Sequence, residues 1–257
     1  MPLPFRSAPD LSGRTVAVTG ASGSLGQALL HQLHQRGARL VALTSGNTPL
    51  AIADQAGQPI PLQQLSWSCG AEEQLREALA GCDLLVINHG VNCHNDRSPA
   101  AVQLSLEVNA LSSWRLLELF AEISRSDPPE RPARELWMNT SEAEIQAAVS
   151  PLYELSKRLQ GQLLSLRSLD LAGPQLRIRR LVLGPFRSAL NPIGVMSADF
   201  VAQEVLRQVG WNCGLVIVTP NPLTYLLMPL ATLSRWLYFR SFSSPSTPEE
   251  PIRSRGR

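Results

Sequence analysis

Short apolar runs alternate along this chain with longer stretches of helical periodicity. The runs show no apolar/polar alternation, which is typical of strands buried on both faces of a parallel sheet. Strands separated by helices predict βαβ units. The expected strands are residues 16–19, 40–43, 84–87, 136–139, 178–183 and 215–218, with a strand end at 65–68, and the expected helices are 24–36, 71–80, 99–123, 152–171 and 198–209. We therefore expect an α/β fold, a Rossmann-type, doubly wound, mostly parallel sheet in a single domain over residues 11–220.

An apolar segment follows this domain at residues 221–242. Pro229 and Arg235 interrupt it, so we do not expect the roughly 20 apolar residues of a membrane-spanning helix. Two interpretations stay open: the segment packs on the core or on a partner subunit, or it contacts a membrane interface through residues such as Trp236. Ser, Pro and Arg dominate residues 243–257, which predicts a disordered tail.

Composition and charge narrow the class of protein. The 257 residues are 44% hydrophobic and 17% charged, with a formal net charge of +2, which indicates a globular protein and gives no basis for nucleic-acid binding. The four cysteines show no CxxC or CxxH spacing, so neither a disulfide framework nor a metal site is expected. The N-terminus lacks the apolar core of a signal peptide, and we expect a cytoplasmic location.

Three glycines, Gly20, Gly23 and Gly26, follow the first expected strand. A strand, a glycine-rich turn, a helix and a second strand within about thirty residues form the pattern of a dinucleotide-binding unit. Glycines let the backbone approach a pyrophosphate, and the helix N-terminus supplies N–H donors. The candidate cofactor-binding residues at this turn are Gly20, Ser22, Gly23, Ser24, Leu25 and Gly26.

The ends of two further strands bear on the cofactor. Thr44 and Ser45 stand where an acidic residue would bind the adenosine ribose of NAD and repel the 2′-phosphate of NADP. The missing acid favours NADP, but only weakly, because no arginine stands there to hold a phosphate. Asn88 and Gly90 follow the strand 84–87 and are candidates to line the nicotinamide ribose.

The candidate catalytic groups are Ser141, Tyr153 and Lys157. Ser150 and Pro151 predict the start of a helix, which places Tyr153 and Lys157 on one helix face. A lysine ammonium beside a phenol is expected to lower the pKa of the tyrosine, so that it donates and accepts protons near neutral pH. Ser141, delivered by the preceding strand, could hold a substrate oxygen.

Two residues stand out from their surroundings. Lys157 is the single lysine in a chain that has 22 arginines. Lysine and arginine are not interchangeable at a tuned site, so the lone lysine supports a chemical role. Asn109 lies inside an expected helix although asparagine is a poor helix former. We expect it to hold a water or a backbone carbonyl next to the active site.

In this order and spacing, the motifs resemble the short-chain dehydrogenase/reductase family over residues 11–220. The matching pieces are residues 19–26, 88–90, Asn109, Ser141, residues 153–157 and residues 184–188. The segments INHGVN, WMNTSEAE and SPLYELSK further resemble the dehydrogenase half of cyanobacterial bifunctional proteins. In those proteins the dehydrogenase half is fused to a sterol-desaturase-like domain.

The resemblance implies a role for each catalytic candidate. Tyr153 would be the general acid/base, and Lys157 would lower its pKa and bind the nicotinamide ribose. Ser141 would hold the substrate oxygen, with Thr140 as the alternative, and Asn109 would complete a proton-relay tetrad.

On the cofactor side, the resemblance extends to the loop that begins at Gly184. There, Ser188 stands where members of the family usually have a threonine that contacts the carboxamide. His89 departs from the family, which usually has alanine at that position.

The implied activity is NAD(P)-dependent oxidoreduction of an alcohol/carbonyl pair by hydride transfer. Two alternatives stay open: an epimerase or dehydratase that recycles its nicotinamide, and a non-catalytic dinucleotide-binding partner of a membrane lipid enzyme. The apolar C-terminal segment suggests a small, hydrophobic or lipid-like substrate, and the habit of the family suggests a homo-oligomer.

Overall fold

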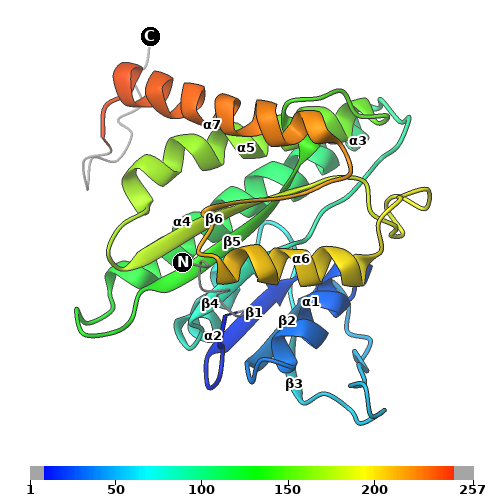
Figure 1. Cartoon of the computed structure of the whole chain (residues 1–257), viewed down its shortest axis with the longest axis vertical. Helices are drawn as coiled ribbons and strands as arrows, with labels where there is room; N and C mark the ends of the chain where they lie inside the picture. Colours follow the sequence, from blue (N-terminus) through cyan, green and yellow to red (C-terminus); the bar gives the residue numbers. More distant parts are fainter. Residues whose placement is uncertain (1–8, 246–257) are drawn as a thin grey trace, which may run out of the picture.

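The computed structural model describes residues 9–245 and shows a seven-stranded sheet with helices on both faces (Figure 1). All paired strands are parallel, in the order β3-β2-β1-β4-β5-β6-β7. The strand order reverses between β1 and β4, where sheets of this kind bind ligands at their carboxyl edge. The strands are β1 (Thr15–Thr19), β2 (Arg39–Thr44), β3 (Leu62–Ser66), β4 (Leu84–Ile87), β5 (Arg134–Ser141), β6 (Leu176–Leu183) and β7 (Leu215–Val218). The predicted Rossmann-type fold is thus confirmed.

Helices cover the two faces of the sheet in separate groups. On one face α1 packs against α6, and on the other face lie α2, α4 and α5. The helices are α1 (Ser24–His34), α2 (Arg76–Ala80), α3 (Pro99–Leu106), α4 (Ser112–Arg125), α5 (Pro151–Leu171), α6 (Ala198–Gly210) and α7 (Pro222–Phe242), with short turns η1 (Glu72–Leu75), η2 (Glu107–Leu111) and η3 (Glu142–Glu144).

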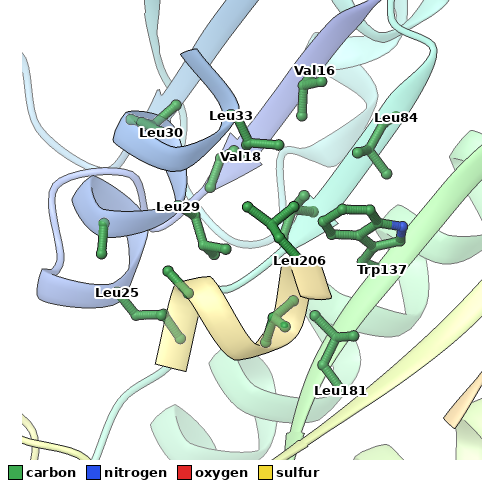
Figure 2. Close-up of a cluster of buried hydrophobic side chains, with 14 of the residues drawn as sticks. Val16, Val18, Leu25, Leu29, Leu30, Leu33, Leu84, Trp137, Leu181 and Leu206 are labelled. Carbon is green, nitrogen blue, oxygen red and sulfur yellow. The ribbon is translucent and has the colours of Figure 1, made fainter. Parts of the chain in front are cut away.

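The core is divided by the sheet into two layers. Val16 and Val18 of β1 face the layer under α1 and α6, whereas Ala17 between them faces the opposite layer. Figure 2 shows the first layer, in which Leu29 of α1 and Leu206 of α6 lie close to the sheet. Because apolar side chains on both sides of β1 are buried, the strand is an uninterrupted apolar run in the sequence.

Three predicted elements differ in the structure. The strand end expected at 65–68 belongs to β3, which begins earlier at Leu62 and lies at an edge of the sheet. The helix expected over 71–80 begins as the tighter turn η1. The long helix expected over 99–123 is interrupted by η2, a π turn. An edge strand needs few apolar residues, and a π turn inserts one residue without breaking the helical pattern, so neither is visible in the apolar periodicity.

The apolar segment after β7 forms the helix α7, which lies along α5 (Figure 1). Met228 packs with Val182 of β6 and Ile217 of β7 in a small separate cluster. Within residues 9–245, no helix combines the length and the apolar character that crossing a membrane requires. Of the tail predicted over residues 243–257, positions 246–257 lie outside the described residues.

Candidate active site

The glycine-rich turn between β1 and α1 has a shape that suits a pyrophosphate. Gly20 has φ +61°, and a Cβ there would lie 2.9 Å from the Cα of His89. A Cβ on Gly26 would lie 2.2 Å from the carbonyl oxygen of Gly20, so only glycine lets α1 begin this close to β1. No side chain caps the N-terminus of α1, where Ser22, Gly23 and Ser24 are exposed. The uncapped N–H groups and the helix dipole suit an anionic group.

The turn after β4 is fixed against this glycine-rich turn. The Asn88 amide nitrogen donates to the Gly20 carbonyl at 3.3 Å, and its side-chain oxygen accepts from Asn139 at 2.5 Å. The hydroxyl of Thr19 accepts the backbone N–H of Asn88 at 2.8 Å and lies 2.9 Å from Nδ1 of His89. Desolvation lowers the pKa of His89 to about 4, and the charge of Lys157 adds to this effect. His89 is therefore neutral at physiological pH, and it contributes to the turn by packing and by its contact with Thr19 rather than by a charge.

The end of β2 places its two predicted residues differently. Thr44 is buried, and its hydroxyl donates to the Gly46 carbonyl at 2.8 Å and accepts from Gln64 at 3.2 Å. Ser45 is exposed. Of the two, Ser45 therefore has the hydroxyl that is open to a ribose or a phosphate.

The end of β5 delivers Ser141 to the candidate substrate site. Its hydroxyl is hydrogen-bonded to Tyr153, and both residues line a pocket of about 520 Å³. Thr140, its neighbour, donates to the Leu181 carbonyl at 3.4 Å and points toward β6. The geometry thus pairs Ser141, and not Thr140, with Tyr153.

The helix α5 begins where the sequence predicts, at Pro151 with Ser150 as its N-cap. The Ser150 hydroxyl does not cap the helix but donates to the His94 carbonyl at 2.7 Å. Glu154 instead accepts the N–H of Ala148 at 2.9 Å. The Ser150 bond holds the loop before α5 against the loop after β4, and the Glu154 bond holds the first of these loops to α5. Both loops line the pocket.

The expected effect of Lys157 on Tyr153 is not the effect that the structure shows. The pKa of Tyr153 is raised, mainly because burial disfavours the phenolate, while the hydrogen bond with Ser141 lowers it and Glu142 raises it further. Lys157 Nζ lies 5.7 Å from the centroid of the Tyr153 ring and donates to Gln160 Oε1 at 2.9 Å. The predicted lowering is thus wrong for this arrangement, in which Tyr153 is a neutral phenol able to donate a proton.

Lys157 is buried and belongs to a chain of polar groups. Burial lowers its pKa to about 8, and Glu144 opposes this shift. Gln160, which accepts from Lys157, donates through Nε2 to the Ser113 hydroxyl at 3.1 Å, and that hydroxyl donates to the Asn109 carbonyl at 3.2 Å. A continuous hydrogen-bonded path therefore joins the ammonium to the backbone of Asn109.

Asn109 lies in the π turn η2 and is fully buried. Its side chain bonds both backbone groups of Val91, accepting the N–H at 2.8 Å and donating to the carbonyl at 2.9 Å. It also donates to the Ser156 hydroxyl at 2.9 Å. π turns occur frequently at functional sites. Here the turn lets Asn109 fix the loop after β4, including Gly90, where a Cβ would lie 3.1 Å from Asn109 Oδ1.

The loop after β6 lies between the catalytic residues and the glycine-rich turn. A Cβ on Gly184 would lie 2.3 Å from Thr219 Oγ1, so the loop leaves β6 in close contact with the end of β7. Ser188 lines the 520 Å³ pocket and also a hollow of about 420 Å³ that it shares with Ser24 and Arg187. These two hollows run from the N-terminus of α1 to Tyr153.

Several site residues escaped the sequence analysis. Gln160 and Ser113 lie on helices, where isolated polar residues are indistinguishable from solvent-facing ones. Glu144 is buried and pairs with Arg180 at 3.1 Å and with Arg235 at 2.7 Å. Buried charges need partners, but the two partners of Glu144 lie 36 and 91 residues away in the sequence, which no local pattern reveals.

Comparisons with known proteins find similarities of sequence and of fold. Residues 16–143 match the NAD dependent epimerase/dehydratase family. A Monoglucosyldiacylglycerol epimerase of Synechocystis sp. is 46% identical over 240 residues, which are 93% of this chain and 57% of that protein. The chain thus spans little more than half the length of this curated relative.

Two solved structures share the fold at lower identity. A short chain dehydrogenase of Burkholderia cenocepacia, in complex with NADP, has a TM-score of 0.72 at 19% identity and covers 92% of this chain and 100% of its own. The aldohexose dehydrogenase of Thermoplasma acidophilum has a TM-score of 0.67 at 16% identity and covers 95% of this chain and 100% of its own. These likenesses concern the fold.

Proposed function

We propose that this chain, which has the NAD(P)-binding Rossmann fold of the short-chain dehydrogenases, transfers hydride between an alcohol carbon and a nicotinamide, with Tyr153 as general acid/base. The observation that carries the proposal is that Ser141 and Tyr153 line one pocket, with the buried Lys157 Nζ 5.7 Å from the centroid of the Tyr153 ring. Ser188 lines both this pocket and the hollow at the uncapped N-terminus of α1. A dinucleotide-binding partner without catalytic function would not need these three groups together.

The proposed division of labour follows from the geometry. The turn from Gly20 to Gly26 and the N-terminus of α1 would hold the pyrophosphate, and Arg187 beside Ser24 would add positive charge. When bound, the nicotinamide supplies the hydride chemistry. The protein then has to orient the substrate oxygen and to move one proton.

Ser141 and Tyr153 would carry out that proton transfer. Ser141 holds the substrate oxygen by a hydrogen bond, in place of the bond it makes to Tyr153 in the structure. In the reducing direction the neutral phenol of Tyr153 donates its proton to the carbonyl oxygen, and in the oxidising direction the phenolate takes the alcohol proton. The Lys157 ammonium would bond the ribose hydroxyls of the nicotinamide nucleotide.

For the overall reaction we propose epimerisation of a sugar carbon on a glycosylated diacylglycerol. The identity of 46% over 93% of the chain to a protein named as an epimerase of such a lipid favours this reaction over a net dehydrogenation. The alcohol carbon would be oxidised to a ketone and reduced on its other face, so that the nicotinamide is regenerated in each turnover. As for the cofactor, the acid-free end of β2 still weakly favours NADP over NAD.

The experiment is incubation of the purified protein with monoglucosyldiacylglycerol and a trace of NAD⁺ or NADP⁺. Analysis of the released sugar together with absorbance at 340 nm separates the outcomes. Conversion of more lipid to an epimeric sugar than there is nucleotide, without net reduction, supports the epimerase. Reduction of the nucleotide, one for each ketone formed, with no further conversion supports a dehydrogenase. A product that Tyr153→Phe forms at the wild-type rate would contradict the assigned role of Tyr153.

A further inference from the structure

The helix α7 has an apolar face that points away from the protein. Its opposite face is buried through Thr224 and Met228. The outward face is a stripe of five leucines, Leu223, Leu226, Leu230, Leu233 and Leu237, whose side chains are each 51–61% exposed. Single exposed leucines are ordinary, but a stripe at three- and four-residue spacing along one helix is a contiguous patch and marks an interaction site.

The start of α7 lies next to a loop that lines the catalytic pocket. Val149 and Ile193, on the two loops that line the pocket, are 92% and 83% exposed. The first of these loops is bonded to the start of α7, because Gln146 donates to Thr224 at 2.7 Å and accepts from Asn221 at 2.5 Å. In Figure 1 the start of α7 and the loop between β6 and α6 lie at the same end of the molecule.

The charges and aromatic rings of α7 suit a lipid interface. The helix contains no Asp or Glu, and Arg235 is directed inward to Glu144. Arg240 lies over the ring of Trp236 at 5.4 Å, and Tyr238 is exposed beside them. Trp, Tyr and Arg next to an apolar stripe are the composition of helices that lie in the plane of a membrane interface.

We propose that the leucine stripe of α7 and the rim residues Val149 and Ile193 rest on a lipid bilayer and admit the lipid substrate from it. This inference rests on the proposed function, because the acyl chains of a diacylglycerol lipid stay in the bilayer while its sugar must reach Tyr153. A protein partner over the same surface would close the mouth of the pocket between Val149 and Ile193. A bilayer covers this surface and at the same time supplies the substrate.

Hydrogen bonds connect α7 to the segment that carries Ser141, so contact between α7 and a bilayer would bear on catalysis. Arg235 bonds both the carboxylate of Glu144, at 2.7 Å, and its backbone carbonyl, at 3.3 Å. Glu144 ends the short turn η3 that begins directly after Ser141. The docked helix is therefore fastened to the catalytic segment, and the bilayer would orient the mouth of the pocket through it.

The test is co-sedimentation of the full chain with vesicles of phosphatidylcholine, alone or mixed with phosphatidylglycerol, without cofactor or turnover. The variant L226Q/L230Q/L233Q should lower the vesicle partition coefficient at least about tenfold, because interfacial binding scales with the apolar area inserted. W211Q, which removes an exposed aromatic residue after α6, is the matched control and should leave the partition unchanged. Melting temperatures verify that the variants fold.

The result is independent of the proposed activity. Vesicle binding by the wild type that the triple variant loses supports the docking surface even if no epimer forms. A wild type that does not sediment with either vesicle overturns the inference even if the enzyme is active. If the triple variant then changes from a dimer to a monomer in light scattering, a second copy occupies the stripe and the bilayer does not.

Discussion

The site has two halves that depend on different kinds of contact. The first half is the turn between β1 and α1, and the second half is the set of polar residues around α5. In the glycine-rich turn between β1 and α1, the close contacts are between backbone atoms, as where Gly26 meets the Gly20 carbonyl. Around α5, the close contacts are between buried polar side chains, as where Lys157 meets Gln160. The first half therefore depends on shape and the second on the placement of protons and charges. Changes in the first half should act on cofactor binding. Changes in the second half should act on the chemical step, except at Lys157, which would also bond the nicotinamide ribose.

The largest effect is expected for Tyr153→Phe. Removing the hydroxyl removes the proton donor, and general acid/base groups contribute about 10²–10⁴-fold to a rate. Turnover should fall by about 10³-fold while NADPH still binds, because Tyr153 belongs to the second half. Steady-state kinetics and nicotinamide fluorescence check both parts. A matching loss of cofactor affinity would show that the two halves are not separable.

Gly26→Ala should distort the turn between β1 and α1 and so weaken cofactor binding. The new Cβ would lie 2.2 Å from the Gly20 carbonyl and 2.8 Å from the Ala21 Cα, and these are backbone atoms that cannot turn away. Overpacking of this kind costs about 1–3 kcal/mol, which corresponds to a loss of cofactor affinity of up to about a hundredfold. Isothermal calorimetry measures it. The control is Gly214→Ala, where a Cβ meets open space, and equal affinities for both variants would refute the role of shape.

The titration of Lys157 should make both the stability of the chain and its affinity for NADH depend on pH. Its pKa is lowered to about 8 from 10.5, so the folded chain loses this proton at lower pH than the unfolded chain. Between these values the unfolded state holds more protons, and the stability contributed by this group rises with pH. Over the same range the ammonium is lost, so the NADH dissociation constant should rise by up to about tenfold per pH unit above 8. In Lys157→Met this dependence should be absent; a profile unchanged from wild type would contradict the assignment.

A smaller effect is expected for Gln160→Leu, which cuts the hydrogen-bonded path from Lys157 to Asn109. The loss of one hydrogen bond to a charged group costs about 1.5–3 kcal/mol in general, but a freed lysine can find a water, so we expect a fall in kcat of about tenfold or less. In Gln160→Glu the added negative charge should move the pH inflection of Lys157 upward. An unmoved inflection in both variants would show that Gln160 does not position Lys157.

Most strands of the sheet, and the glycine-rich turn of the first half, were predictable from the sequence. Buried parallel strands such as Leu84–Ile87 and Leu215–Val218 are uninterrupted apolar runs, and the structure has them at the predicted residues. The glycine spacing predicts the turn between β1 and α1, because a Cβ at Gly20 or Gly26 would collide with backbone atoms. The edge strand β3, with the sequence LQQLS, carries no such run and was misplaced by three residues at its start.

In the second half, the catalytic motif was predictable from the sequence, but the hydrogen bonds around Lys157 were not. The spacing of Tyr153 and Lys157 is local, and the start of α5 follows from Pro151. The links from Lys157 to Gln160, Ser113 and Asn109 run between helices, so no sequence period reports them. The direction of the Tyr153 pKa was predicted wrongly because burial, the largest cause, depends on the packing of the whole pocket.

The most direct test of this account is a fluorescence titration with NADPH and NADH of three proteins: the wild type, Gly26→Ala and Tyr153→Phe. The account predicts saturable binding by the wild type and by Tyr153→Phe, with NADPH bound at least as tightly as NADH, and strongly weakened binding by Gly26→Ala. The absence of saturable binding of either nucleotide to the wild type would contradict the account, because every role assigned to Tyr153 and Lys157 presupposes a bound nicotinamide.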